Sequence, residues 1–151
     1  GVKDENIKEG ITKIKSIARL QEIKSGKFKN ICKNNRLYLD GSHNPLGAKA
    51  LNEYLNTLDC KKHLILGMMS NKDHEEYISH FHNISSITTI DIPNQPNAIK
   101  GEELKKKLNK YPNVSYKKSI EEALNSLNSE RDDLIIITGS LYLAGELLNL
   151  N

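Results

Sequence analysis

The sequence has little cysteine and no long hydrophobic run. Its 151 residues include two cysteines, Cys32 and Cys60, whose spacing matches no metal or redox motif. We therefore expect two free thiols in a reducing compartment, which indicates the cytoplasm. No apolar run approaches the roughly 20 residues that a membrane-spanning helix needs, and the first residues are too polar for a signal peptide. We predict neither a membrane partner nor a secreted protein.

An excess of charge of one sign is also missing. Lysine and arginine together number 22 against 19 acidic residues, which leaves a net charge of +3. The one dense basic run, 105–107, lies beside Glu102 and Glu103 in a helical pattern. We interpret it as a solvated helix face, so we predict no nucleic-acid partner.

The sequence further lacks the phosphate-binding loop G-x-x-x-x-G-K-[ST]. Gly41 and Gly47 have the wrong spacing and are followed by Ala48, and Gly139 and Gly145 fail in the same way. No set of acidic residues has magnesium-ligand spacing, and four histidines form no metal pattern: His63, His74, His80 and His82. We predict no metal site in this chain and expect His74 to be exposed to solvent.

Strand and helix patterns alternate along the chain. We expect helices at 4–15, 46–58, 73–81, 101–109, 119–127 and 141–148, and strands at 19–23, 37–39, 63–67, 87–92, 114–116 and 134–138. Strands without polar alternation, such as 63–67 and 134–138, are typical of a sheet covered on both faces. The pattern predicts a three-layer α/β fold with a mostly parallel six-stranded sheet. Its first strand is expected to be antiparallel, because the link after it holds the turn residues 25–27 and no helix.

The length suits one domain, which we place at residues 17–151. Residues 1–16 are expected to be the tail of a preceding domain or a linker helix. Since the sequence starts at Gly1 rather than at methionine, we expect it to be part of a longer protein.

The most informative stretch runs from Arg36 to Pro45. Its apolar residues 37–39 predict a strand, Asn44 is a good helix cap, and Pro45 suits a first helical turn. Asp40, Ser42 and His43 would then lie between the carboxyl end of a strand and the amino end of a helix, where open α/β sheets bind ligands. Turn chemistry alone is compatible with a plain turn, a cap and an exposed His43.

Residues 40–45, DGSHNP, resemble the D-G/A-A/S-H-N-P box of folylpolyglutamate synthase and dihydrofolate synthase, members of the Mur ligase superfamily. Three further segments are similar to that family: 19–21 (RLQ), 67–73 (GMMSNKD) and 138–146 (TGSLYLAGE). Two departures are Ile17-Ala18 in place of Pro-Gly and Asn71 in place of an acid. The resemblance implies the Rossmann-like C-terminal domain of a Mur ligase.

The resemblance implies an ATP-dependent ligase that joins glutamate to dihydropteroate or folate through an acyl phosphate. Asp40 would bind the ATP ribose, Arg19 the nucleotide phosphates, and His43 and Ser140 the glutamate. No residue of this domain is assigned a catalytic role. The phosphate-binding loop and the magnesium ligands would belong to an N-terminal ATPase domain, without which we expect the chain to be inactive. Lys72 and Asp73 are interpreted as loop and helix cap.

Alternatives remain for single residues and for the whole chain. Arg19 could be an arginine at a sheet edge in water, and Ser140 could serve only as a helix cap. The chain could also be a stand-alone nucleotide-binding or regulatory module, or the inert product of a split gene. The sequence leaves open whether the whole enzyme makes dihydrofolate, extends polyglutamate tails, or does both.

Overall fold

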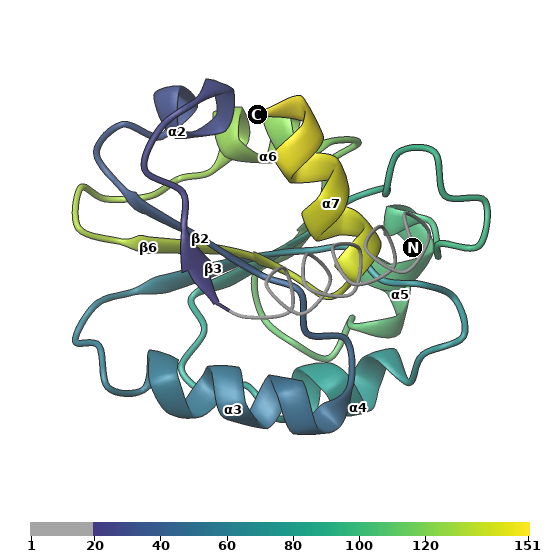
Figure 1. Ribbon diagram of the computed structural model, residues 1–151. Coiled ribbons are helices and arrows are strands. Elements are labelled where there is room, and N and C mark those ends of the chain that lie inside the picture. The colour runs from purple at the N-terminus through teal and green to yellow at the C-terminus, as the bar shows by residue number, and fades with distance from the viewer. Residues whose placement is uncertain (1–19) are drawn as a thin grey trace, which may run out of the picture.

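The computed structural model describes residues 20–151, which build a six-stranded sheet (Figure 1). The strands are β1 (Gln21–Glu22), β2 (Arg36–Asp40), β3 (Lys62–Leu66), β4 (Ser86–Thr89), β5 (Val114–Tyr116) and β6 (Leu134–Thr138). Their order is β1-β2-β6-β3-β4-β5, with β1 antiparallel to β2 and the other pairs parallel. The predicted sheet is therefore confirmed, whereas the helix expected at 4–15 lies outside the described residues.

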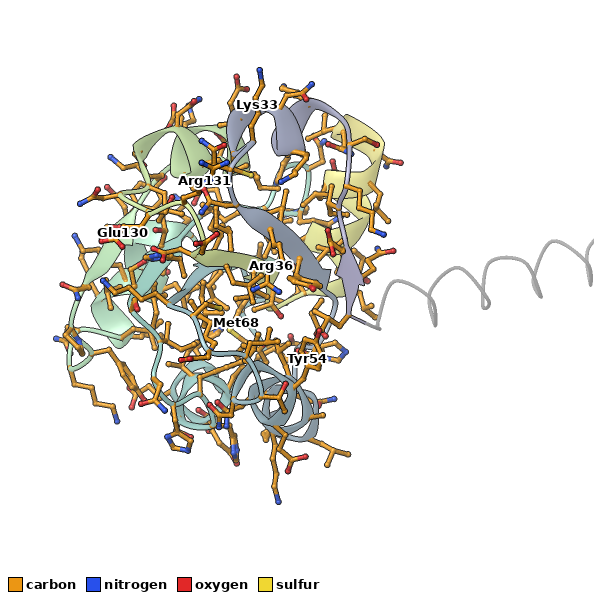
Figure 2. All side chains as sticks on the ribbon, turned by 90° about the vertical axis from the view of Figure 1, so that its left-hand side faces the viewer. Lys33, Arg36, Tyr54, Met68, Glu130 and Arg131 are labelled. Carbon is orange, nitrogen blue, oxygen red and sulfur yellow. The ribbon has the colours of Figure 1, made fainter. Side chains whose placement is uncertain are left out.

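Helices cover both faces of this sheet and complete the predicted three layers. One face carries α2 (Lys27–Ile31), α6 (Ile120–Ser126) and α7 (Leu141–Leu150), and the other carries α3 (Pro45–Leu55), α4 (His74–Ser79) and α5 (Gly101–Lys107). Figure 2 looks along the strands and shows the sheet between the two helical layers. In the part of the chain that is described, no helix is both long and apolar enough to cross a membrane.

Burial on both faces explains why the central strands contain runs of consecutive apolar residues. All five residues of β3 and of β6 are buried. Because successive side chains of a strand point to opposite faces, Ile135 and Ile137 join the core under α2, α6 and α7, while Leu134 and Ile136 join the core under α3, α4 and α5. The sheet thus separates two hydrophobic cores, and polar groups are left to its two ends.

Helix caps fix where the chain turns from strand to helix. Asn44 accepts a hydrogen bond from the Gly47 N–H (2.9 Å) at the start of α3. Asp73 caps α4 by accepting from the Glu76 N–H (3.0 Å), and Ser119 caps α6 by accepting from the Glu122 N–H (3.2 Å). The three caps predicted from the sequence are confirmed.

The link between β1 and β2 was predicted wrongly, because it contains the helix α2. This helix is five residues long, too short to show a helical period, and its Phe28 is only 2% exposed. Asn151 holds its first turn by accepting from the Phe28 N–H (3.0 Å) and donating to the Ser25 carbonyl (3.0 Å). Long-range contacts of this kind leave no local sequence pattern.

The expectation that His74 is exposed was also wrong. Its side chain is buried at the start of α4, and its Nε2 donates a hydrogen bond to the Met69 carbonyl (2.9 Å). The bond ties α4 back to the loop that follows β3. Strand β4 also ends at Thr89 rather than at residue 92, and just beyond it the Asp91 side chain accepts from the Gly101 N–H (2.7 Å) at the start of α5.

Candidate functional site

Three turns meet at the carboxyl end of the sheet, after β2, β6 and β3. The strands are neighbours in register, with Asp40 beside Thr138 and Thr138 beside Leu66. Backbone hydrogen bonds continue past the strands, from the Gly139 N–H to the Ser42 carbonyl (3.1 Å) and from the Gly67 N–H to the Thr138 carbonyl (3.2 Å). The segments 40–45 and 138–146, which carry the resemblance, are therefore adjacent in space.

Gly139 makes this close approach possible. Its φ of +114° is a conformation that residues with a Cβ rarely adopt, and a Cβ placed there would lie 2.4 Å from the Gly67 carbonyl oxygen. Two backbone turns thus come together at a position that admits only glycine. Gly139 at the end of β6 is consequently a requirement of the site's shape.

A chain of hydrogen-bonded hydroxyl groups, centred on Tyr77 of α4, joins the turns after β2 and β6. Tyr77 of α4 is fully buried, and its hydroxyl lies 2.9 Å from Thr138 Oγ1 and 3.0 Å from Ser42 Oγ. The Tyr77 hydroxyl also lies 3.2 Å from the Ser42 carbonyl. Burial raises the pKa of Tyr77 well above its usual value, so the hydroxyl stays protonated. One side chain of α4 thereby fixes the turns after β2 and β6 relative to each other.

Asp40 is buried at the end of β2, beside a pocket of about 330 Å³. Its Oδ1 accepts a hydrogen bond from the Ser42 N–H (2.7 Å), and its Oδ2 makes no hydrogen bond within residues 20–151. Burial raises the pKa of Asp40, although the bonds from Ser42 act in the opposite direction. The pocket is otherwise mainly apolar, lined by Leu20, Ala50, Leu51 and Tyr54 among others. This arrangement suits a ligand with an apolar body and a hydroxyl group.

His43 is partly buried in the turn that leads into α3. Its Nδ1 is buried and has no hydrogen-bond partner among the described residues. Burial lowers the pKa of His43, and the nearby charge of Lys72 lowers it further. The imidazole is therefore mostly neutral at pH 7 and can serve a ligand as a hydrogen-bonding group rather than as a cation.

Ser140 caps α7 and is only 1% exposed. Its Oγ accepts from the Tyr142 N–H (3.1 Å) and from the Leu143 N–H (3.5 Å), so the predicted capping role is confirmed. The structure brings the turns of His43 and Ser140 together through their backbones and shows no hydrogen bond between the two side chains. The helices that follow them, α3 and α7, diverge to opposite faces of the sheet.

Arg19 lies outside the described residues, so its predicted contact with nucleotide phosphates stays a prediction. The next residue, Leu20, lines the same pocket as Asp40. Across the described range, no three His, Cys, Asp or Glu side chains gather closely enough to hold a metal ion. Nothing on this edge of the sheet is therefore assigned to magnesium.

Sequence reasoning missed Tyr77 and Thr138, the two side chains that hold the turns together. Tyr77 lies in an expected helix and was interpreted only as part of it. Its role depends on contacts across 35 and 61 positions of the sequence. The available signal was weaker: a tyrosine needs a partner for its hydroxyl when it is buried, and the turns hold such partners.

Comparison with known proteins agrees with this geometry. Residues 19–141 match the family model described as Mur ligase, glutamate ligase domain. Among curated proteins, none matches the sequence. Among solved structures, the fold is similar to folylpolyglutamate synthase from Thermotoga maritima, with 24% identity and a TM-score of 0.72 over 88% of this chain and 30% of that one.

Two further solved structures extend the comparison. The folylpolyglutamate synthase of Mycobacterium tuberculosis, complexed with ADP and AMPPCP, has 20% identity and a TM-score of 0.68 over 83% of this chain and 32% of that one. The bifunctional folylpolyglutamate synthase/dihydrofolate synthase of Yersinia pestis has 20% identity and a TM-score of 0.65 over 77% of this chain and 28% of that one. The chain thus spans about 30% of the length of the structures it resembles. Because the family model matches most of the sequence, this chain belongs to the Mur ligase family of ATP-dependent ligases, as a C-terminal glutamate ligase domain.

Proposed function

We propose that this domain is the C-terminal part of a ligase that uses ATP to add glutamate to dihydropteroate or folate. The similar structures include one complexed with ADP and another with Mn, AMPPNP and L-glutamate bound. In such a reaction ATP phosphorylates a carboxylate, and the amino group of glutamate attacks the acyl phosphate. The acyl phosphate must be kept from water, which a domain closing over the nucleotide achieves. This chain would be that closing domain.

The buried Asp40 carboxylate carries the proposal. One of its oxygens is already held by the Ser42 N–H, which fixes the carboxylate, and the other makes no hydrogen bond in the described residues. Ribose hydroxyls would donate to that second oxygen while the mainly apolar pocket receives the rest of the nucleoside. Arg19, which precedes Leu20 at this pocket, would meet the phosphates with its planar, permanently charged guanidinium group.

Magnesium, when bound, screens the charge of the triphosphate during phosphoryl transfer. We place its ligands in an ATPase domain that precedes this chain, since the described residues offer no metal-binding cluster. On this proposal the isolated chain turns over no ATP.

Kinetics of the full-length protein test the nucleotide contact. Losing a hydrogen bond to a charged group costs about 1.5–3 kcal/mol, so Asp40→Ala should raise KM for ATP by roughly tenfold or more. Asp59→Ala changes an exposed carboxylate near the other end of the sheet and should leave KM unchanged. Equal KM values in both variants would remove the nucleotide role of Asp40.

We assign the glutamate contact to His43 and Ser140. Each lies at the start of a helix of ten or more residues, whose N–H groups favour the carboxylates of glutamate. His43→Ala and Ser140→Ala should raise KM for glutamate with much less effect on KM for ATP. Ser119→Ala removes the cap of a different helix, α6, and it separates the loss of a cap from the loss of a ligand contact. His82→Ala is the matched control for His43, because His82 is exposed.

Gene context and substrate assays decide between the candidate functions. An ATPase domain encoded in frame upstream supports the ligase, whereas a stop codon there supports a stand-alone module or the product of a split gene. Glutamate ligation by the full-length protein, measured with dihydropteroate and with tetrahydrofolate in turn, then identifies the acceptor. Activity with neither acceptor would contradict the folate branch of the proposal.

A further inference from the structure

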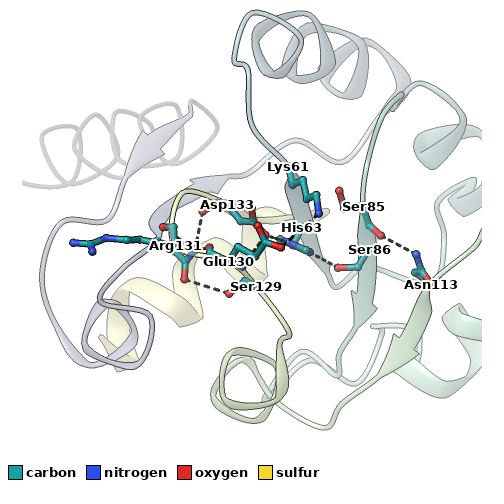
Figure 3. Close-up of polar contacts among 10 residues, drawn as sticks. Lys61, His63, Ser85, Ser86, Asn113, Ser129, Glu130, Arg131 and Asp133 are labelled. Atoms are coloured by element: carbon teal, nitrogen blue, oxygen red, sulfur yellow. Dashed lines mark hydrogen bonds and ion pairs between the residues drawn. The ribbon is translucent and has the colours of Figure 1, made fainter.

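A second polar cluster lies at the opposite, amino end of the sheet. Figure 3 shows His63 of β3 between Ser86 of β4 and Asp133, which directly precedes β6. His63 Nδ1 lies 2.7 Å from Ser86 Oγ, and His63 Nε2 lies 2.8 Å from Asp133 Oδ2. The three side chains form a continuous hydrogen-bonded chain from a hydroxyl to a carboxylate.

Strand register brings these residues together. His63 pairs with Ser86 of β4 on one side of β3 and with Ile135 of β6 on the other. The side chains of these paired residues therefore share the face covered by α2, α6 and α7. Asp133 lies two residues before Ile135 and therefore on the same face. Its position follows from the parallel pairing of β3 with β6.

The carboxylate in this cluster is fixed and ionised. Asp133 Oδ2 also accepts from the Glu130 N–H (2.9 Å), and the Asp133 carbonyl accepts from the Asn35 side chain (2.9 Å). Burial is the largest single influence and raises the pKa of Asp133, but the hydrogen bonds from His63 and the Glu130 N–H, together with nearby positive charge, outweigh it, so the pKa lies below the usual value. When the imidazole is neutral and its Nε2–H donates a hydrogen bond to the ionised carboxylate, Nδ1 is the nitrogen that can accept a hydrogen bond from the Ser86 hydroxyl.

Along this hydrogen-bonded chain, Ser86 has the position of a nucleophile, His63 that of a base and Asp133 that of the acid that orients the base. The two imidazole nitrogens are exchanged relative to the usual serine triad. Either nitrogen of a neutral imidazole can accept a proton while the other is held, so the chemistry is the same. His63 and Asp133 are 5% and 6% exposed, which keeps water from competing for their hydrogen bonds.

The serine and the histidine also face space for a ligand. A pocket of about 540 Å³ is lined by His63 and Ser86, and Thr88, Lys117 and Asn128 contribute to its wall. Its size is in the range of small-molecule sites. Lys117 and Asn128 carry N–H donors of the kind that a developing oxyanion requires. The half-buried Ser86 is thus in contact with a cavity rather than sealed in the core.

We propose that Ser86 is the activated nucleophile of a second site, which accepts the acyl group of small esters. Ser86 Oγ forms a bond to the ester carbonyl carbon and passes its proton to His63 Nδ1. The bond to the alcohol oxygen then breaks, and that oxygen takes the proton from Nδ1. Water, activated by the same nitrogen, releases the acid and restores the serine. This site is at the other end of the sheet from Asp40 and does not depend on the ligase proposal.

A fluorophosphonate probe tests the proposal on the chain as it stands. Ser86 Oγ would form a bond to phosphorus as fluoride leaves, and peptide mapping of the labelled protein should find the adduct on Ser86. Ser86→Ala should abolish that adduct. Ser85→Ala is the matched control, since Ser85 lines the same pocket but makes no hydrogen bond to His63, and labelling of Ser86 should persist.

The rate of labelling distinguishes a catalytic chain from a merely structural one. A general base contributes about 100-fold or more, so Asp133→Asn, which disturbs the orientation of His63, should slow labelling by roughly that factor. Peptide mapping of the labelled protein with its native sequence needs no variant, so this part of the test does not depend on whether Ser86→Ala folds. No adduct on Ser86, or equal labelling of Ser85 and Ser86, would overturn the proposal.

Discussion

The two ends of the sheet carry hydrogen-bonded chains of different chemistry. At the carboxyl end, Ser42, Tyr77 and Thr138 are linked through hydroxyl groups alone. At the amino end, which Figure 2 faces, a histidine and a carboxylate form the chain with Ser86. The first chain holds two turns in place without any charge, whereas the second includes a buried ionised group.

This difference indicates that the two ends of the sheet contribute differently to stability and to the geometry of the candidate site. Removing one hydroxyl from a buried chain of neutral groups leaves a single partner unsatisfied, which costs about 1–3 kcal/mol. Removing the buried carboxylate costs more, because His63 Nε2–H and the Glu130 N–H both lose their acceptor. We therefore expect the amino end to dominate stability and the carboxyl end to dominate the geometry of the proposed nucleotide and glutamate site.

The largest loss of stability is expected when the hydrogen-bonded chain at the amino end of the sheet is disrupted. Asp133→Ala leaves His63 buried without its partner and removes the acceptor of the Glu130 N–H. Two donors each lose an acceptor at about 1–3 kcal/mol, so the free energy of unfolding should fall by about 2–6 kcal/mol, measured by urea denaturation at pH 7. Asp132→Ala, an exposed neighbour, should change it by no more than about 0.5 kcal/mol. Similar values for the two variants would refute the contrast between the two ends.

A glycine pair tests the close approach of turns at the carboxyl end. Gly139→Ala forces a Cβ into a positive φ and against the Gly67 carbonyl, so it should cost about 1–3 kcal/mol of unfolding free energy. Gly145→Ala lies in α7, where an added Cβ meets nothing within 4 Å, and it should stabilise the protein by up to about 1 kcal/mol. Opposite shifts of the melting temperature are expected, and shifts of the same sign would count against the steric argument.

Tyr77→Phe isolates the hydroxyl chain while it keeps the ring in place. We expect a loss of about 1–2 kcal/mol of unfolding free energy, smaller than that of Asp133→Ala, since only neutral partners lose a bond. If Asp40 binds the nucleotide as proposed, the same change in the full-length protein should also raise KM for ATP, because Ser42 and the Asp40 carboxylate it holds are released. An altered stability with unchanged KM would show that the turn keeps its geometry without Tyr77.

The smallest effect concerns pH. The folded pKa of Asp133 lies below its unfolded value, so its contribution to stability is complete above the unfolded pKa of about 3.9 and is lost as pH falls through the folded pKa. Asp133→Asn has no such group to titrate. The gap in unfolding free energy between the two proteins should therefore narrow below about pH 4. A gap that is constant from pH 6 to pH 3 would contradict the lowered pKa.

The sheet could be predicted because its information is local. Strands such as β3 and β6 contain consecutive apolar residues, and caps such as Asp73 lie directly before their helices. The turn after β2 was recognised for the same reason, since residues 40–45 are consecutive. Position in such a turn was enough to place Asp40 and His43 at the carboxyl end of the sheet.

The rest depends on partners that are distant in the sequence. His63 and Asp133 are 70 positions apart, and Tyr77 meets Thr138 across 61. Helix α2 is stabilised by Asn151, which is more than 120 positions away. The buried His74 donates a hydrogen bond to the Met69 carbonyl in the preceding loop. None of these pairs produces a periodic pattern, so only the assembled fold reveals them.

The position of β6 has a consequence for how the chain is made. It is the last strand of the sheet in the sequence, yet it lies between β2 and β3. During synthesis on a ribosome, β1 to β5 all precede β6. The pair β1–β2 and the group β3–β4–β5 are joined only through β6, so they cannot form one sheet until residues 134–138 have been made. Until then the adjoining edges of β2 and β3 stay open to other chains. We expect protection by a chaperone to matter most in that interval.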